Sequence, residues 1–391
     1  MQRIALVTGG SGFLGSYVVR DLLAEGFDRI IILMRGDDVD ECEQRLRALW
    51  WERPELASEI GKRIQIACGN ITCEQLGLED DRYRELASNV THIIHAAAEI
   101  GVNQTAERFA EANVEGTLNV LLFAEMAHRE GNLKRLVHVS TAYVAGMRNG
   151  IIHESELVNA GFNSLYEQSK FGAEQLVRDV SPRIPASIVR PAQIVGDSET
   201  GFAATFNTLY YPLKLYLKGE LPVIPVSADQ KNNMIPVDFV SRIVVSALVE
   251  PSAVGKTFHA VIPADQQPTA GELLAFVRAW AIRELHFDPG NARCIPLSFA
   301  SAVGRTRNLA KSSTPKRKSL MQNMLALAPY FAENRTYDAA NTEALLAEPA
   351  SSPITSWDGF LVEPSEPARF DHVPFDATAT MTAKSSSQAP R

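Results

Sequence analysis

The sequence predicts an α/β fold with a doubly wound parallel sheet, and three observations support this prediction. Short apolar runs alternate with amphipathic helical stretches through the first half of the chain. The first run breaks at once into a glycine-rich turn, Thr8-Gly-Gly-Ser-Gly-Phe-Leu-Gly15, and a helical pattern follows it. Polar residues able to do chemistry come directly after later runs, at the strand ends where ligands bind in such sheets.

Bulk composition narrows the function classes. The 391-residue chain suits one large domain or two, and its 46% hydrophobic and 21% charged residues are ordinary for a globular protein. A net charge of −8 argues against a nucleic-acid partner, because phosphate neutralisation needs a basic surface. The first strand starts too early to leave room for a signal peptide, and no run reaches the roughly 18 apolar residues of a membrane span. We therefore expect a cytoplasmic protein without a membrane span.

The four cysteines form neither a CxxC pair nor a cluster with histidines. The sequence therefore predicts free thiols in a reducing compartment and no metal site. These cysteines are Cys42, Cys68, Cys73 and Cys294.

The glycine turn indicates a Rossmann-type nucleotide site after a strand over Ile4–Val7. Gly9 would allow the tight turn, Gly12 would let a pyrophosphate approach the backbone, and Gly15 would let the helix pack closely on the strand. The free N–H groups and the positive end of that helix would hold the phosphates. The predicted contacts in this turn are Gly9, Ser11, Gly12, Phe13, Leu14 and Gly15.

A second buried strand over Arg29–Met34 ends at Arg35, where the adenosine ribose lies in this architecture. An acidic residue at this position favours NAD, whereas an arginine can pair with the 2′-phosphate of NADP. Arg35, with Arg45 on the next helix, therefore favours NADPH. Asp37 and Asp38 follow closely, so NAD remains an alternative cofactor. The alternative interpretation of Arg35 is a solvated surface arginine.

Two more strands provide further predicted cofactor contacts. Ile64–Ala67 ends at Gly69, and the next two residues could meet the adenine edge. Val90–His95 runs into three alanines, whose small side chains would let the cofactor lie against the strand end. We expect His95 to be structural. The predicted contacts are Asn70, Ile71, Ala96, Ala97 and Ala98. A long helix is expected over Phe109–Ala127, with Asn113 bracing the site through backbone hydrogen bonds.

The candidate catalytic residues follow a fifth strand, Arg135–Val139. Ser140 and Thr141 stand at its carboxyl end, and Tyr166 and Lys170 lie four apart on one helical face. A tyrosine with a pKa near 10 donates a proton readily at neutral pH, and a nearby ammonium favours its phenolate. Thr141, or Ser140, would hold the substrate oxygen while Tyr166 protonates it.

The second half of the chain carries fewer signals. A strand over Ile188–Arg190 leads to the last predicted cofactor contacts, Pro191 and Ile194. The aromatic stretch over 201–221 is either a substrate wall or core, and Ile235–Asp238 is expected to return to the sheet. We predict a cofactor domain over 1–196 with 232–262, a substrate-binding subdomain over 197–231 and 263–345, and a flexible tail over 346–391. Six basic residues between Arg305 and Lys318 form a patch that is either solvated or docks an acidic acyl carrier protein.

Taken together, roughly residues 1–340 resemble the extended short-chain dehydrogenases/reductases, and within them the thioester reductases and fatty acyl-CoA reductases. The motifs that carry the resemblance are the glycine turn, Leu33-Met-Arg-Gly36, His95-Ala-Ala-Ala98, Val139-Ser-Thr-Ala-Tyr-Val144, Tyr166-Glu-Gln-Ser-Lys170 with Ala173-Glu174, Val189-Arg-Pro191 with Val195-Gly-Asp197, and Pro236-Val-Asp238.

This resemblance implies NADPH-dependent reduction of an acyl thioester to the aldehyde, sometimes onward to the alcohol. By position, Thr141, Tyr166 and Lys170 match the catalytic residues of the family, and Arg35 matches the residue that meets the 2′-phosphate. The family often has Gly-Asp where this chain has Gly69-Asn70. Relatives are often fused to adenylation and carrier modules, so a carrier-bound substrate is expected to come in trans.

Two alternatives remain open on the sequence. One is another enzyme of the extended family, such as a hydroxysteroid-type or ketone dehydrogenase or a nucleotide-sugar epimerase; Arg35 speaks against an epimerase that holds NAD tightly. The other is an NADP-sensing protein without turnover, which could dispense with Tyr166 and Lys170. The acyl group, and the choice between coenzyme A and a carrier protein as its donor, are not encoded in any motif of the chain.

Overall fold

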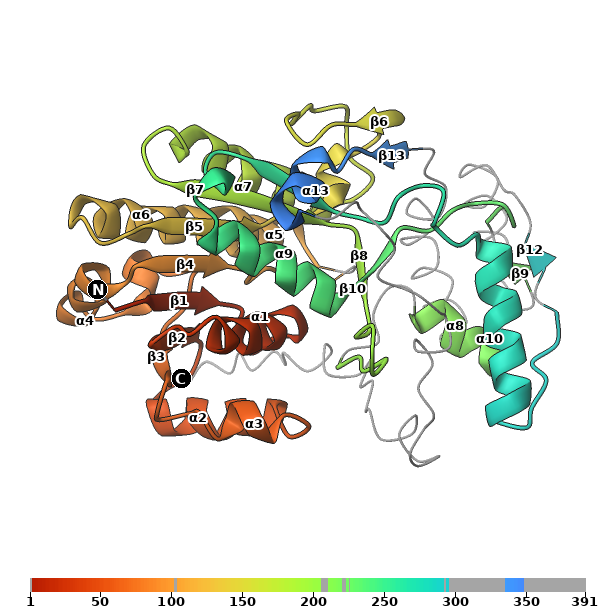
Figure 1. The fold of residues 1–391 in the computed structure, drawn as a ribbon, viewed down its shortest axis with the longest axis horizontal. Helices are drawn as coiled ribbons and strands as arrows, with labels where there is room; N and C mark the ends of the chain where they lie inside the picture. The colour runs from red at the N-terminus through yellow and green to blue at the C-terminus, as the bar shows by residue number, and fades with distance from the viewer. Residues whose placement is uncertain are drawn as a thin grey trace, which may run out of the picture.

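The computed structural model describes residues 2–101, 104–204, 210–219, 223–224, 226–291, 293–294 and 335–347. Its centre is a seven-stranded parallel sheet in the order β11-β7-β5-β4-β1-β2-β3 (Figure 1). The strands are β1 Ile4–Thr8, β2 Arg29–Met34, β3 Ile64–Cys68, β4 His92–His95, β5 Arg135–Val139, β7 Ala186–Pro191 and β11 Thr257–Ala260. The strand order reverses between β1 and β4, which confirms the predicted doubly wound sheet.

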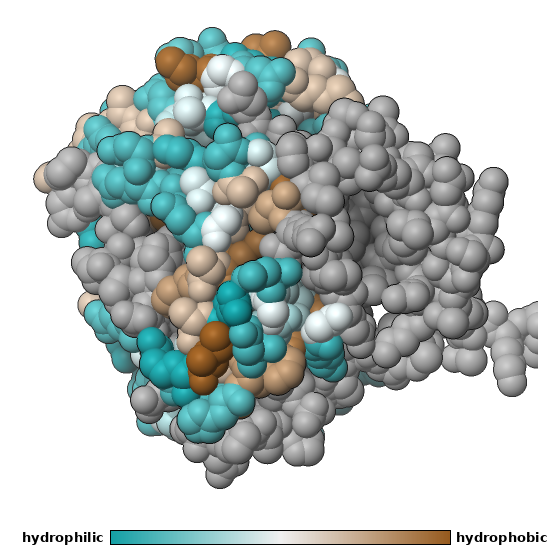
Figure 2. Space-filling model, turned by 90° about the vertical axis from the view of Figure 1, so that its right-hand side faces the viewer, coloured by the Kyte–Doolittle hydropathy of each residue, from teal (hydrophilic) through white to brown (hydrophobic). Residues whose placement is uncertain are grey.

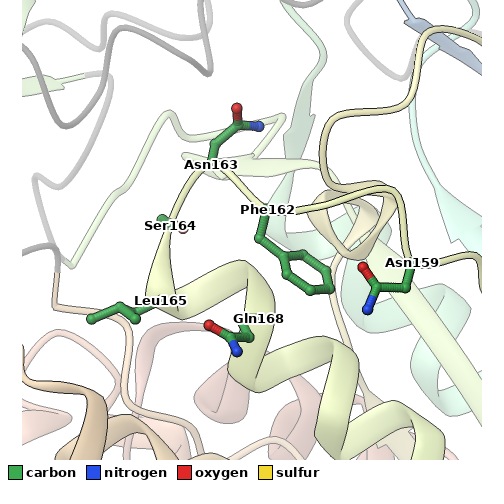
Figure 3. Close-up of a pocket in the computed structure, with 6 residues that line it drawn as sticks. All are labelled: Asn159, Phe162, Asn163, Ser164, Leu165 and Gln168. Atoms are coloured by element: carbon green, nitrogen blue, oxygen red, sulfur yellow. The ribbon is translucent and has the colours of Figure 1, made fainter.

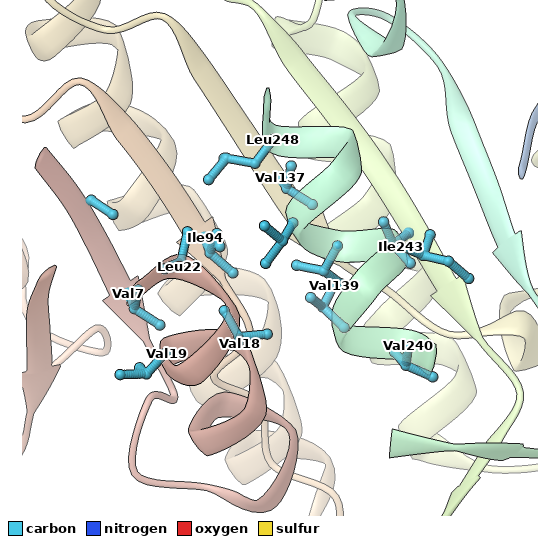
Figure 4. Packing of buried hydrophobic residues seen from close by; sticks show 14 of the residues in the cluster. Val7, Val18, Val19, Leu22, Ile94, Val137, Val139, Val240, Ile243 and Leu248 are labelled. Atoms are coloured by element: carbon cyan, nitrogen blue, oxygen red, sulfur yellow. The ribbon is translucent and has the colours of Figure 1, made fainter. Parts of the chain in front are cut away.

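Helices cover both faces of this sheet, as buried parallel strands require. On one face, α1 (Phe13–Ala24) packs beside α9 (Val237–Val249) over strand residues such as Val7 and Val137 (Figure 4). On the other face lie α4 (Asp80–Asn89), α6 (Gly116–Arg129) and α7 (Leu165–Val180). Successive residues of β1 point to opposite cores, Val7 to the first and Leu6 to the second. This alternation explains why every residue of β1 is buried.

Two predicted elements differ from the observed ones. The helix expected over 109–127 is interrupted, because a π-helical stretch, Ala110–Glu115, joins α5 (Ala106–Phe109) to α6. The strand Met234–Pro236, β10, does not join the main sheet. It pairs in parallel with β8 (Gln193–Val195) in a separate two-stranded sheet. The chain returns to the main sheet later, through α9 and β11.

A smaller group of elements has its own apolar contacts. It contains α8 (Tyr210–Leu217), α10 (Ala270–Glu284) and the short pair β9 (Val223–Ile224) and β12 (Arg293–Cys294). Tyr216 packs with Leu274 and Val277 between the two helices. In Figure 1 the arrowheads of the central strands point toward this group, so the carboxyl edge of the sheet faces it.

The segment 335–347 packs on the sheet domain, which differs from the predicted division of the chain. Its strand β13 (Arg335–Tyr337) pairs with β6 (Gly150–Ile152), and its helix α13 (Ala340–Leu346) packs on α9 and β11. The buried carboxylate of Glu154 fastens it, accepting hydrogen bonds from the Asn341 N–H at 2.6 Å and the Thr342 hydroxyl at 3.1 Å. Most of the predicted tail, Phe206 of the aromatic stretch and the basic patch lie outside the described residues.

On the face shown in Figure 2, hydrophilic residues cover much of the described surface, with apolar residues scattered among them. None of the helices in the described part of the chain combines the length and the hydropathy that crossing a bilayer needs.

Candidate active site

In the glycine turn between β1 and α1, backbone segments lie too close together for side chains at Gly9 and Gly15. Gly9 has a φ of +75°, and a Cβ there would lie 2.7 Å from the backbone nitrogen of Ala97. A Cβ on Gly15 would lie 2.0 Å from the carbonyl oxygen of Gly9, so the turn and the helix touch backbone to backbone. Gly12 is the N-cap of α1 and is exposed. The amino end of α1 is therefore presented at the carboxyl edge of the sheet, with no side chain at the cap to fill the place of an anion.

The two arginines predicted for the 2′-phosphate lie together at the end of β2. The Arg35 carbonyl accepts a hydrogen bond from the Arg45 guanidinium. Arg45 also pairs with Glu41, with 3.2 Å between its Nη1 and the carboxylate Oε1. The Arg35 side chain is exposed. This corner therefore presents two guanidinium groups, one of them partly neutralised by a carboxylate.

The remaining predicted contacts line the same edge. The Asn70 side-chain oxygen accepts from the Thr72 N–H at 3.2 Å, so it closes its own loop. Ile71 lies against Gly116, at the start of α6. The three alanines after β4 are half-buried, and the Ala97 N–H donates to the Thr8 hydroxyl at 3.3 Å.

Thr141, Tyr166 and Lys170 meet at the ends of β5 and β7. The Thr141 hydroxyl donates to the Pro191 carbonyl at 3.3 Å and shares a hydrogen bond with Tyr166. Lys170 donates from Nζ to the Val139 carbonyl at 2.9 Å. Tyr166 and Lys170 are one turn apart on α7, as the spacing predicted. The structure thus brings the three candidate catalytic residues together.

Burial changes the acidity of both α7 residues. It raises the pKa of Tyr166 to about 12, and the hydrogen bond with Thr141 acts in the opposite direction. It lowers the pKa of Lys170 to about 8, while the charge of Glu174 acts to raise it. Tyr166 is therefore a protonated phenol at neutral pH, beside a lysine that titrates close to neutrality.

The geometry separates Ser140 from Thr141. The Ser140 hydroxyl donates to the Glu174 carboxylate, with 2.7 Å between the oxygens, whereas the Thr141 hydroxyl contacts Tyr166. The two hydroxyls that the sequence left open therefore have different partners, Glu174 for Ser140 and Tyr166 for Thr141.

Asn113 braces α7 from the π-helical stretch, and its predicted backbone hydrogen bonds are present. Its side chain accepts from the Glu99 N–H at 2.7 Å and donates to the Glu99 carbonyl at 3.0 Å. It also donates to the hydroxyl of Ser169, which lies between Tyr166 and Lys170, at 2.9 Å. Asn113 therefore ties the loop after β4 to α7.

His95 is structural, as expected. Its ring nitrogens contact the hydroxyls of Thr8 at 2.7 Å and Thr117 at 3.0 Å. Burial lowers the pKa of His95 to about 3, so the ring is neutral at physiological pH.

Glu174 and Arg190 belong to the sequence motifs, but no pattern in the sequence indicates a role for either. Both side chains are fully buried, and they form an ion pair with 2.6 Å between Arg190 Nη2 and Glu174 Oε1. An arginine inside an apolar strand indicates a buried ion pair, because burying an unpaired charge costs free energy.

A pocket of about 570 Å³ opens at the start of α7 (Figure 3). Leu165 and Gln168 contribute to it, and they lie on a different helical face from Tyr166 and Lys170 because successive helix residues are about 100° apart. The pocket is therefore beside the catalytic face. It is lined by Asn159, Phe162, Asn163, Ser164, Leu165 and Gln168. In the described part of the chain, no group of His, Cys, Asp and Glu side chains could hold a metal ion.

Comparison with known proteins agrees with this geometry. A model of an NAD-binding family, described as "Male sterility protein", matches residues 7–244. L-2-aminoadipate reductase of Saccharomyces cerevisiae is 28% identical over 263 residues, which cover 63% of this chain and 19% of that protein. The chain spans about a fifth to a third of the length of the curated relatives it matches.

Two solved structures are informative. The terminal R domain from the myxalamid PKS-NRPS biosynthetic pathway is 26% identical, with a TM-score of 0.74 and coverage of 93% of this chain and 92% of that one. UDP-glucuronic acid 4-epimerase from Bacillus cereus, in complex with NAD, gives a TM-score of 0.62 at 18% identity over 92% and 95% of the two chains. The second likeness shows the fold alone.

Proposed function

The chain belongs to the NAD-binding family described as male sterility protein, and from that premise we propose that it is an NADPH-dependent reductase that converts an acyl thioester to an aldehyde. The observation that carries the proposal is the meeting of Thr141, Tyr166 and Lys170 at the sheet edge that also holds the glycine turn. The likeness to a reductase and to a terminal R domain supports a thioester as the substrate.

The site fits a dinucleotide, because the Cβ positions of Gly9 and Gly15 are taken by backbone and the exposed amino end of α1 suits a pyrophosphate. Arg35 and Arg45 would meet the 2′-phosphate, and Asn70 and Ile71 the adenine. The alanines 96–98 would lie along the cofactor. The nicotinamide half would contact Tyr166, Lys170, Pro191 and Ile194. When bound, the cofactor supplies a hydride.

The protein's own part in the reaction is the handling of a proton. Thr141 would hold the oxygen of the reacting carbonyl, and Tyr166 would donate its proton to that oxygen. Addition of a hydride to the carbonyl carbon and of this proton to its oxygen gives a hemithioacetal, which releases a free thiol and leaves the aldehyde. A charged Lys170 would stabilise the phenolate left on Tyr166, since opposite charges nearby favour each other's ionised forms.

The acyl donor is coenzyme A or a carrier protein, and a second reduction to the alcohol would use the same residues. A carrier is supported by the likeness to a terminal R domain of a PKS-NRPS pathway. The alternative of an epimerase rests on a likeness that shows only the fold. Arg35 favours NADPH over the NAD that such an epimerase retains.

The test is NADPH oxidation by the purified protein with three substrate sets: acyl-CoA thioesters, carrier-bound acyl thioesters and free aldehydes. We expect oxidation with a thioester, together with one equivalent of free thiol and an aldehyde or alcohol product. Turnover with aldehydes or ketones alone would replace the proposal by an ordinary carbonyl reductase. Inactivity with all three sets, with NAD retained through purification, would favour the epimerase.

A further inference from the structure

A buried ion pair underlies the catalytic residues. Glu174 on α7 and Arg190 on β7 are 0% and 1% exposed at their side chains, and Arg190 donates from Nη2 and Nε to the two carboxylate oxygens at 2.6 and 3.0 Å. Burial acts to raise the pKa of Glu174, but the charges of Arg190 and Arg178 hold that pKa below its usual range. The carboxylate is therefore ionised. Burying two charges is expensive, and such a pair does little for stability compared with apolar residues of the same size.

The pair connects the segments that carry the catalytic side chains. Glu174 lies one helical turn after Lys170, and its Oε2 accepts from the Ser140 hydroxyl at 2.7 Å. Arg190 directly precedes Pro191, whose carbonyl accepts from Thr141. One carboxylate therefore links α7, the turn after β5 and the end of β7.

The same carboxylate is the negative charge that acts on Lys170. Besides the phenol of Tyr166, which is neutral, the ionisable groups on which Lys170 acts are His95 on β4 and His138 on β5. Burial lowers the pKa of His95 to about 3 and that of His138 well below its usual value, so both rings are neutral at the pH of the reaction. Burial works against the ammonium of Lys170, and Glu174 is the group that opposes this effect.

We propose that Glu174, held by Arg190, is a positioning residue: it fixes the Ser140–Thr141 turn against α7 and supplies the charge that keeps the ammonium of Lys170 beside Tyr166. The proposal rests on the proposed reductase function. It goes further because it gives the buried pair of Glu174 and Arg190 a role: the pair sets the position of Thr141 and the charge of Lys170.

The test uses Glu174→Gln, which keeps the shape and removes the charge. We expect kcat to fall by about 10- to 100-fold, because small displacements of reacting groups have effects of this size. The KM for NADPH should be unchanged. The alkaline limb of the kcat profile should move down by about one pH unit, because a nearby opposite charge shifts a pKa by about that much or more. Glu174→Asp, which restores the charge, should restore the limb.

Two further variants separate positioning from stability. In the double variant Glu174→Leu, Arg190→Met, apolar side chains replace the whole pair, a change that buried ion pairs often tolerate. We expect it to unfold near the wild-type temperature and to keep the kinetic defect. Arg178→Gln is the matched control, because Arg178 also binds Glu174 Oε1, at 2.9 Å, but is partly exposed, and its other partners, the Ser155 carbonyl and the Thr257 hydroxyl, carry none of the three catalytic side chains. Its pH profile should match that of the wild type.

A direct readout makes the result independent of the substrate. The Lys170 side-chain resonances of isotope-labelled protein, assigned with Lys170→Arg, should titrate at a lower pH in Glu174→Gln than in the wild type. If no substrate is turned over, the reductase proposal fails and this titration still decides the role of Glu174. An unchanged Lys170 titration, or a folded Glu174→Gln protein with wild-type kcat and pH profile, would overturn the inference. Recovery of kcat in the apolar double variant would do the same.

Discussion

Burial acts in opposite directions on the pKa values of Tyr166 and Lys170, which lie one turn apart on α7. It raises the pKa of Tyr166 to about 12 and lowers the pKa of Lys170 to about 8. A neutral phenol and an ammonium therefore coexist near pH 7. This combination suits reduction, in which the phenol must give up a proton and the resulting phenolate must be stabilised.

Replacing Tyr166 by phenylalanine removes the proton donor and little else. We expect kcat to fall by about 100-fold or more, in line with the usual contribution of a general acid. The midpoint of thermal unfolding should change little, because the ring remains against Phe109. Steady-state kinetics and a melting curve check both points. Near-normal turnover in a folded variant would remove Tyr166 from the mechanism.

Replacing Arg35 by alanine should separate the two cofactors. We expect the KM for NADPH to rise about 10- to 100-fold, as the loss of a charged hydrogen bond implies. The KM for NADH, which lacks the 2′-phosphate, should stay within about twofold of its wild-type value. Arg47→Ala is the control, since Arg47 lies on the same stretch of chain but binds the Ala57 carbonyl at 2.7 Å. Equal effects of Arg35→Ala on both cofactors would contradict this role.

At the residue scale, local spacing in the sequence predicted which of the candidate side chains share a helical face. Tyr166 and Lys170 are one turn apart, so any helix through them puts both on one face. Ser140 and Thr141 were not separable, because only the fold shows that Glu174 occupies one of the two hydroxyls. Arg190 and Glu174 are 16 residues apart and belong to different elements, so their pairing depends on how β7 meets α7.

Among the elements, the β1–α1 turn leaves no room for a side chain at Gly15, where a Cβ would lie 2.0 Å from the Gly9 carbonyl oxygen. We expect Gly15→Ala to destabilise the protein by about 1–3 kcal/mol, because overpacking forces the backbone to shift. It should also abolish cofactor binding, since the shift displaces the amino end of α1. Urea unfolding and cofactor titration measure the two effects.

Gly172→Ala provides the matched control for that variant. Its Cβ would have a single close neighbour, the Val114 side chain at 3.5 Å, and the residue sits inside α7. We expect it to be neutral or stabilising by up to about 1 kcal/mol, because alanine favours helices over glycine. Equal stability losses in the two variants would show that contact with the turn is not what constrains Gly15.

Element by element, apolar periodicity predicted six of the seven strands of the sheet, but not β11 and not the interruption of a helix. The π-helical stretch before α6 leaves no periodic signature, yet it carries Asn113 to the backbone of Glu99. The pairing of β10 with β8 was equally hidden, because a three-residue apolar run fits any parallel neighbour. Local patterns predict that an element exists, whereas its partner is set by tertiary packing.

For the whole molecule, the order of motifs along the chain was the strongest information in the sequence. A glycine turn, a strand-end Ser-Thr and a Tyr-x-x-x-Lys helix, in that order, predicted the doubly wound sheet and the family, and both are confirmed. The packing of 335–347 back onto the sheet was not predicted, because it depends on Glu154 and β6, nearly 200 residues earlier.

Four buried histidines make the stability of the whole fold sensitive to acid. Burial lowers the pKa of His92 and His259 to about 4 and that of His95 to about 3, and it lowers the pKa of His138 well below its usual value. The folded protein therefore keeps these rings neutral at pH values where the unfolded chain, with a pKa near 6.5, already binds protons. Stability must fall as the pH drops below about 6.5.

Between pH 6.5 and 5.5 we expect each such histidine to remove about 1 kcal/mol from the free energy of unfolding. Glu154, whose pKa is raised by burial, acts in the opposite direction. His138→Leu isolates one contribution, because both ring nitrogens of His138 are buried without a partner and an apolar side chain loses nothing there. Urea unfolding at the two pH values should show a loss smaller by about 1 kcal/mol in His138→Leu. His128→Gln, at an exposed position on α6, should leave the wild-type loss unchanged, and the same loss in all three proteins would show that buried histidines do not set the acid sensitivity.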